Sequence, residues 1–172
     1  MDLVKRLLGS WREKRSADAE RDVRSWHEAC RTALDGCLQG LRDPSLPQAE
    51  IGVTLDRVDR ALFQVRDAGS GAQQALRRRA PDLGGRIRRS TEAIVELRNE
   101  TARFLIRAQG PTPAFLQRGE SPAGHPEAYL RAVHDVGQAA RARGLAIQRD
   151  LDELWSELQA VLARPETPAR HG

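Results

Sequence analysis

Histidine, cysteine and glutamate are the residues of this 172-residue chain whose spacing could build a metal site. The sequence HEACR at 27–31 begins like the zinc-protease motif HExxH, but Arg31 stands where the second histidine would be needed. No glutamate is followed three residues later by histidine, the pattern that di-iron helical bundles use. Cys30 and Cys37 share one helix face about 10 Å apart along the axis, too far for a disulfide. We therefore expect no metal, no cofactor and no enzymatic reaction, with Cys30 in the core and His27 at its boundary.

His134 is a histidine for which the sequence offers a covalent role. The stretch HDVGQAARARGL at 134–145 resembles the helix around the phospho-accepting histidine of histidine-phosphotransfer bundles. In that family an exposed histidine is followed by apolar and small residues and by a glycine that leaves room for a receiver domain. Here Gly137 and Gln138 replace the basic residue and glycine of the family pattern, and the stretch lies on the last predicted helix. The resemblance implies phosphate transfer through His134 as an alternative function; otherwise His134 is a surface residue beside the core.

Arginine supplies all but two of the 28 basic residues, and its placement is uneven. Residues 76–89, LRRRAPDLGGRIRR, hold six arginines and one aspartate, and residues 1–15 hold five basic and two acidic residues. The rest of the chain has more acidic than basic side chains. The excess positive charge is thus confined to two segments of an otherwise acidic chain, which favours a contact with an acidic partner.

Apolar residues recur at alternating spacings of three and four along four segments, which predicts four long amphipathic helices. We place these helices at about 16–42, 46–80, 82–109 and 126–164 within a bundle spanning 16–164. Gly69-Ser70-Gly71 lies inside the second helix and predicts a hinge or kink. Residues 110–125 contain three glycines and three prolines and are predicted as a loop, and residues 165–172 as a disordered tail.

Four such helices with mostly short connections predict an all-α fold, an antiparallel up-down four-helix bundle. In this topology the start of the first helix and the turn between the second and third helices lie at one end of the bundle. We call residues 1–15 and 76–89 together the basic end. Gly137 and Gly144 leave the inner face of the last helix with little side-chain volume, and we expect a neighbouring helix to pack closely there rather than a cavity that holds a ligand.

Residues 1–15 are predicted as an extra N-terminal amphipathic helix. At 100° per residue its apolar side chains fall within an arc of about 140°, with Lys5, Arg6 and Arg12 outside it. Such a face can lie in an anionic membrane surface or dock in a groove of a partner protein. The alternative is that Val4, Leu8 and Trp11 extend the core stripe of the first helix.

We expect the protein to be a non-enzymatic scaffold, adaptor or regulatory subunit that docks an acidic protein surface or an anionic membrane through its basic end. No apolar run reaches the length of a membrane span, no secretory signal is recognisable, and the cysteine content suits a reducing compartment. We therefore expect a cytoplasmic location, including the inner face of the membrane as a peripheral site. The long heptad stripes also permit a homodimer.

Nucleic acid is the alternative partner, bound non-specifically through its phosphates. No aromatic residue lies between 64 and 103 to stack on bases, and no nucleic-acid recognition motif is present. The arginines of 77–79 end a helix, where cations are favoured, but those of 86–89 begin one, where cations are unfavourable unless neutralised. We therefore expect an acidic group of a partner near the start of the third helix.

Two sets of residues are expected to make the contacts. The basic end contributes Lys5, Arg6, Trp11, Arg77, Arg78, Arg79, Arg86, Arg88 and Arg89 to the acidic partner, with Leu3 and Leu7 added where that partner is a membrane. Phe115 and Leu116, in the 110–125 loop at the opposite end, are a second candidate contact, with a plug on the end of the bundle as their other role.

Overall fold

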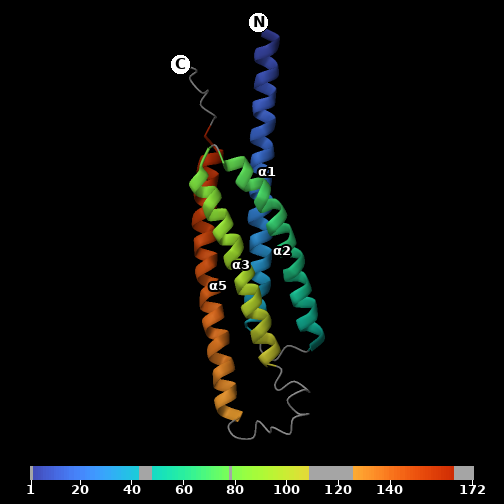
Figure 1. Ribbon diagram of the computed structural model, residues 1–172, viewed down its shortest axis with the longest axis vertical. Coiled ribbons are helices and arrows are strands. Elements are labelled where there is room, and N and C mark those ends of the chain that lie inside the picture. Colours follow the sequence, from blue (N-terminus) through green and yellow to red (C-terminus); the bar gives the residue numbers. More distant parts are fainter. Residues whose placement is uncertain (1, 43–47, 78, 109–125, 165–172) are drawn as a thin grey trace.

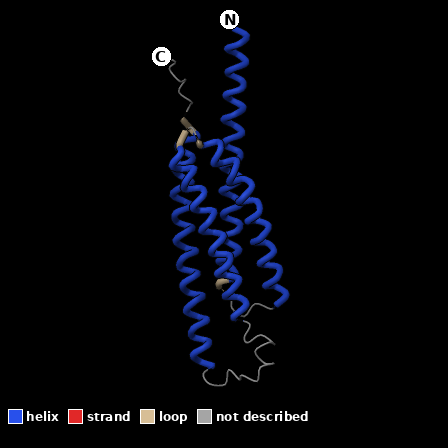
Figure 2. The backbone as a smooth tube through the Cα atoms, in the orientation of Figure 1, coloured by secondary structure: helices blue, strands red, loops and turns tan. Residues whose placement is uncertain are grey.

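The computed structural model describes residues 2–42, 48–77, 79–108 and 126–164 (Figure 1). Over these residues the protein is all-helical, with short turns and no strand (Figure 2). The helices are α1 (Asp2–Gly40), α2 (Gln48–Leu76), α3 (Pro81–Ala108) and α5 (Pro126–Leu162). The predicted all-α class is therefore confirmed. None of the helices in the described part of the chain has an apolar stretch long enough to cross a membrane.

The four helices pack lengthwise as a bundle, and α1 contacts each of the other three. Residue numbers rise along α1 where they fall along α2: Asp22 lies beside Gly71, and Gly40 lies near Thr54. The contacts between α3 and α5 follow the same opposed order, from Arg86 near Glu157 to later residues of α3 near earlier residues of α5. The chain therefore returns on itself along the long axis of the bundle (Figure 1).

A single apolar core runs along the described part of the bundle. Both cysteines lie in it, as expected, and are free thiols. Burial raises the pKa of Cys37 to about 11 and that of Cys30 further, so both thiols stay protonated and unreactive at neutral pH. The largest fully buried side chains are Trp26, Leu34, Leu76, Ile87, Ile94, Leu97, Leu105, Leu151, Leu154, Leu158, Val23 and Val58.

Glycines in the bundle mark close approaches between helices. A Cβ on Gly69 would lie 3.3 Å from Trp26 Cδ1, and one on Gly71 would lie 2.9 Å from Asp22 Oδ2. The helix α2 continues through both positions, so the Gly-Ser-Gly stretch brings α1 and α2 together. This close approach gives the two glycines a packing role, and the hinge or kink expected there stays a prediction.

The bare inner face of α5 is filled by its neighbours. The ring of Phe104 from α3 occupies the space that a side chain at Gly137 would need, and Leu38 Cδ2 would lie 2.7 Å from a Cβ on Gly144. The expected close packing at these two glycines is confirmed. On the surface beside them, Arg143 of α5 bridges to two glutamates of α3, Glu96 and Glu100.

The N-terminal part of α1 extends beyond the other helices (Figure 1). Among the α1 residues whose burial is described, Ala19 is the first that lies in the core. The sequence predicts a separate helix over 1–15, whereas in the structure residues 2–15 belong to α1 without a break. We call residues 2–18 the N-terminal extension. Strong helix formers and the exposed Asp18–Arg21 and Glu20–Arg24 pairs, each 2.8 Å, support the helix where it leaves the bundle.

Candidate interaction surface

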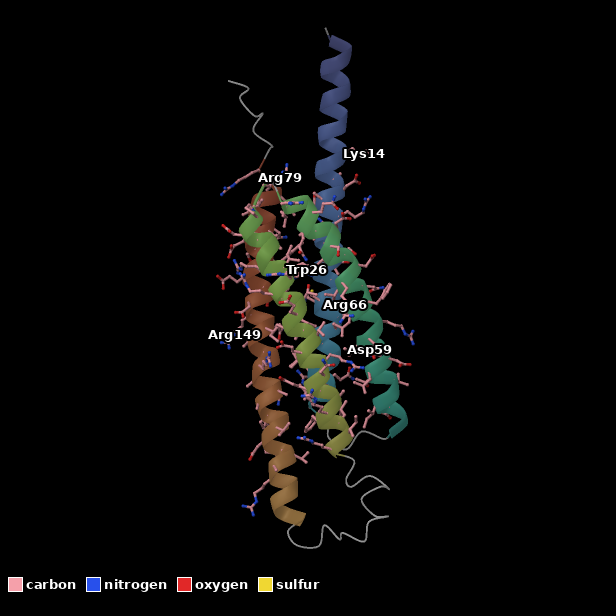
Figure 3. All side chains as sticks on the ribbon, in the orientation of Figure 1. Lys14, Trp26, Asp59, Arg66, Arg79 and Arg149 are labelled. Carbon is pink, nitrogen blue, oxygen red and sulfur yellow. The ribbon has the colours of Figure 1, made fainter. Side chains whose placement is uncertain are left out.

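The N-terminal extension, the α2–α3 turn and the C-terminal end of α5 all lie at one end of the molecule (Figure 1). Figure 3 places Lys14 on the extension and Arg79 at the α2–α3 turn below it. The two basic segments are therefore at the same end, although the extension projects past the turn. Arg164, just after α5, adds an exposed cation at this end.

The arginines at the start of α3 are partly neutralised from within the protein. Arg86, whose side chain is 27% exposed, donates to Glu157 of α5 at 2.6 Å. Arg88 lies 4.0 Å from Glu92, one turn further along α3. Exposed pairs of this kind contribute about 0–1 kcal/mol each, but they remove the need for an external group at Arg86. The expectation that a partner must neutralise this residue is not supported.

The other cations of the 76–89 segment differ in their exposure. Arg77 and Arg89 are exposed, and Arg79 is half-buried and interacts within the protein. Arg78 lies outside the described residues. Among the described arginines of this segment, Arg77, Arg88 and Arg89 are therefore the ones exposed to a partner.

The remaining predicted contact residues divide between two segments. Leu3, Lys5, Arg6, Leu7 and Trp11 lie on the N-terminal extension, whose helical path the structure gives. Phe115 and Leu116 lie outside the described residues, so the second candidate contact stays a prediction.

His27 lies in the core, where the sequence predicts a boundary position. Its side chain is 6% exposed and its ring stacks on Trp155 of α5, with centroids 4.2 Å apart and planes 9° apart. Burial, reinforced by the positive charge of Arg31, lowers the pKa of His27, while Asp152 and Glu28 oppose the shift. The imidazole is therefore neutral at neutral pH and acts as an apolar ring between α1 and α5. The spacing of His27 from Cys30 predicts a position near the core. The sequence does not predict that its ring stacks on Trp155, 128 residues later.

No group of three or more potential metal ligands occurs in the part of the chain that the structure describes. His134 is exposed on α5, as a phosphate acceptor would need to be. The space beside Gly137, three residues later, is however filled by the ring of Phe104 from within the bundle. Gly137 therefore leaves no open notch beside His134 for a docking domain.

Two adjoining surface grooves, each about 330 Å³, follow the line between α1 and α2. Thr32 and Gln64 border both of them. Glu28 and Asp67 line the first groove, and Arg57 and Arg60 line the second together with Val53 and Ala61, so both grooves are open and bordered by charged side chains. Their lining contains no histidine or cysteine, and no nucleophile–base pair is formed there.

Comparison with known proteins gives no relative for this chain: no protein-family model, no curated protein and no solved structure matches it. Its function is therefore inferred from the residues and their geometry.

Proposed function

We propose that this protein is a non-enzymatic helical-bundle adaptor, acting as a scaffold or regulatory subunit, that docks an acidic partner through its basic end. The observation that carries the proposal is the N-terminal extension, which continues α1 well past the helices that cover it elsewhere (Figure 1). A helix outside its own core is stabilised mainly by packing against something else, because propensity alone gives marginal helices in water.

The bundle itself serves as a rigid support in this proposal. We propose an antiparallel up-down four-helix topology, supported by the opposed order of contacts between α1 and α2 and between α3 and α5. In that arrangement the extension and the α2–α3 turn are held at one end by the same core. A cytoplasmic location, peripheral at a membrane where the partner is lipid, belongs to the same proposal.

The proposal that no reaction is catalysed rests on the inertness of the described side chains. Both thiols are buried and protonated, His27 is buried against an indole ring, and the surface grooves contain no histidine or cysteine. Nucleic acid receives less support than a protein or membrane, because no aromatic residue lies between 64 and 103 to stack on bases.

Flotation with lipid vesicles tests the membrane form of the partner. The full chain is mixed with phosphatidylcholine vesicles, with or without phosphatidylserine, at physiological salt. If the partner is a membrane, the chain floats only with the anionic vesicles, and K5Q/R6Q weakens binding about thirtyfold, from about 1 kcal/mol for each basic residue near the surface. The matched control is R57Q/R60Q, which removes two exposed arginines of α2 away from the basic end and leaves flotation unchanged.

A chain that does not float with anionic vesicles has no membrane partner of this kind. An acidic protein is then the remaining form of the proposal, and the peptide experiment in the next subsection tests it. If neither anionic vesicles nor the acidic peptide bind, the proposed docking function is wrong.

A further inference from the structure

The side of α1 that faces α2 is fixed by direct contacts. A Cβ on Gly36 would lie 2.6 Å from Val58 Cγ2, and Asp22 lies against Gly71, as described above. At 100° per residue these two α1 positions fall about 40° apart, so they mark one face of the helix. We call this the α2-facing side of α1.

The apolar positions of the N-terminal extension fall on this same side. Because α1 is one continuous helix, position 4 precedes Asp22 by five full turns and falls on the same line along the helix, and position 11 falls about 20° away. Position 8 is aligned in the same way with Trp26, which itself packs against Gly69 of α2. Val4, Leu8 and Trp11 thus continue the α1–α2 interface beyond the point where α2 ends.

The core-facing line of α1 carries charge in the extension. Position 5 aligns with Val23 and position 12 with Cys30, both fully buried, and these positions hold Lys5 and Arg12. Positions 8 and 11, however, align with the buried Trp26 and Ala29, so the apolar positions of the extension continue the part of the buried side of α1 that lies toward α2.

The space beside this face begins where α2 ends. Asp22 is level with Gly71, and α2 ends five residues later at Leu76, level with about residue 17 of α1. About 16 residues of α1, or about 24 Å, then extend past it. A helix placed end-on above α2 would pack on α1 as α2 does.

The position of α2 distinguishes a helix from a flat surface as the occupant. A membrane lying against the apolar face of a straight α1 would be obstructed by α2, because α2 packs on the same side of α1 and an α-helix is about 10 Å across. Another helix has the same diameter and fits above α2 without displacing it. The geometry therefore favours a helical protein segment over a lipid surface.

The charge at the base of this space indicates the polarity of the occupant. The C-terminal end of α2 carries the negative end of its dipole, which favours the N-terminus of an incoming helix. Exposed Arg77 beside it and exposed Lys14 on the extension favour acidic residues in the first turn of that helix. The first turn of α1 from a second copy, with Asp2 followed by Lys5 and Arg6, matches this charge poorly.

We propose that the N-terminal extension is a docking site for an amphipathic helix of a partner protein that has an acidic first turn and stacks end-on above α2. This inference rests on the proposed docking function and specifies its partner as protein. The apolar side of the incoming helix packs on positions 4, 8 and 11, and its acidic turn lies above the α2–α3 turn.

A synthetic helical peptide tests the proposal directly. The probe has a leucine stripe and glutamates in its first turn and polar positions, and its matched peptide carries glutamine in place of each glutamate. Fluorescence anisotropy is used to measure binding to the full chain at physiological salt. We expect the acidic peptide to bind about tenfold more tightly than the glutamine peptide. The substitution V4N/W11N weakens its binding about tenfold or more, whereas S10N/S16N, off the apolar stripe, changes it less than about twofold.

Three results would overturn the inference. Equal binding of the acidic peptide to V4N/W11N and to the unchanged chain would place the contact elsewhere. Flotation with anionic vesicles that is lost in V4N/W11N, without peptide binding, would assign the face to lipid and leave the docking function standing. A dimer in sedimentation equilibrium that V4N/W11N dissociates would assign the face to a second copy.

Discussion

The substitution of Gly137 by alanine tests the packing between α3 and α5. The ring of Phe104, which is only 3% exposed, lies where the new methyl group would be: Cζ at 2.9 Å and Cδ2 at 3.0 Å from an ideal Cβ. Real side chains do not tolerate such distances, so the ring or the helix must shift. We expect G137A to destabilise the bundle even though alanine is the better helix former.

The expected magnitude follows from two opposing terms. Replacing glycine by alanine inside a helix stabilises by about 1 kcal/mol. Overpacking a buried site costs about 1–3 kcal/mol, which leaves a net destabilisation of about 1 kcal/mol for G137A. Gly52 of α2 provides the matched control, because it is exposed and a Cβ there would meet nothing within 4 Å. We therefore expect G52A to stabilise by about 1 kcal/mol, a difference of about 2 kcal/mol between the variants.

Urea unfolding followed by circular dichroism measures this difference. For a domain of this size, about 1 kcal/mol corresponds to about 2–4 °C in melting temperature, so thermal unfolding gives a second reading. If G137A stabilises the protein as much as G52A does, Phe104 does not occupy the space at Gly137. The close packing of α3 on α5 would then be wrong.

Two further predictions concern buried polar groups. Folding lowers the pKa of His27, so the unfolded chain binds a proton at this residue more readily than the folded chain does. The free energy of unfolding is therefore unaffected above about pH 6.5 and falls as the pH drops below it. H27F removes this dependence, as measured by urea unfolding at several pH values. If H27F retains the same slope, another group is responsible. Trp26 Nε1 donates to Thr91 Oγ1 at 3.1 Å, so T91V leaves a buried indole N–H unpaired and costs about 1–3 kcal/mol in urea unfolding. The exposed Thr32 is the control: T32V should change stability by less than about 0.5 kcal/mol, and an equal loss in both variants would contradict a special role for the buried pair.

Much of the helical structure is predictable from the sequence, because apolar residues at alternating spacings of three and four form a continuous stripe on an α-helix but not on a β-strand. The start of α1 is different. Between Arg12 and Asp18 the only apolar residue is Ala17, so no apolar stripe carries the first helix across this segment. The helix continues there without such a stripe, and the Asp18–Arg21 pair supports it at the point where it joins the bundle.

The candidate surface is less predictable, because its composition depends on partners distant in sequence. Six arginines in fourteen residues indicate a basic surface, but Arg86 is paired with Glu157, 71 residues away. The burial of His27 likewise depends on Trp155 of α5. The direction of the apolar face of the extension required the contacts between α1 and α2, because only these define which side of α1 faces which neighbour.

Removal of residues 2–15 tests the central claim most directly, by comparing the stability of the bundle with its binding in the same truncated chain. We predict that urea unfolding gives a free energy within about 1 kcal/mol of the full chain, because the removed helix lies outside the core, while binding of the acidic helical peptide is lost. A loss of several kcal/mol in the free energy of unfolding would contradict the account, because it would mean that the extension packs on its own bundle. Undiminished peptide binding would also contradict it, because the docking site would then be elsewhere.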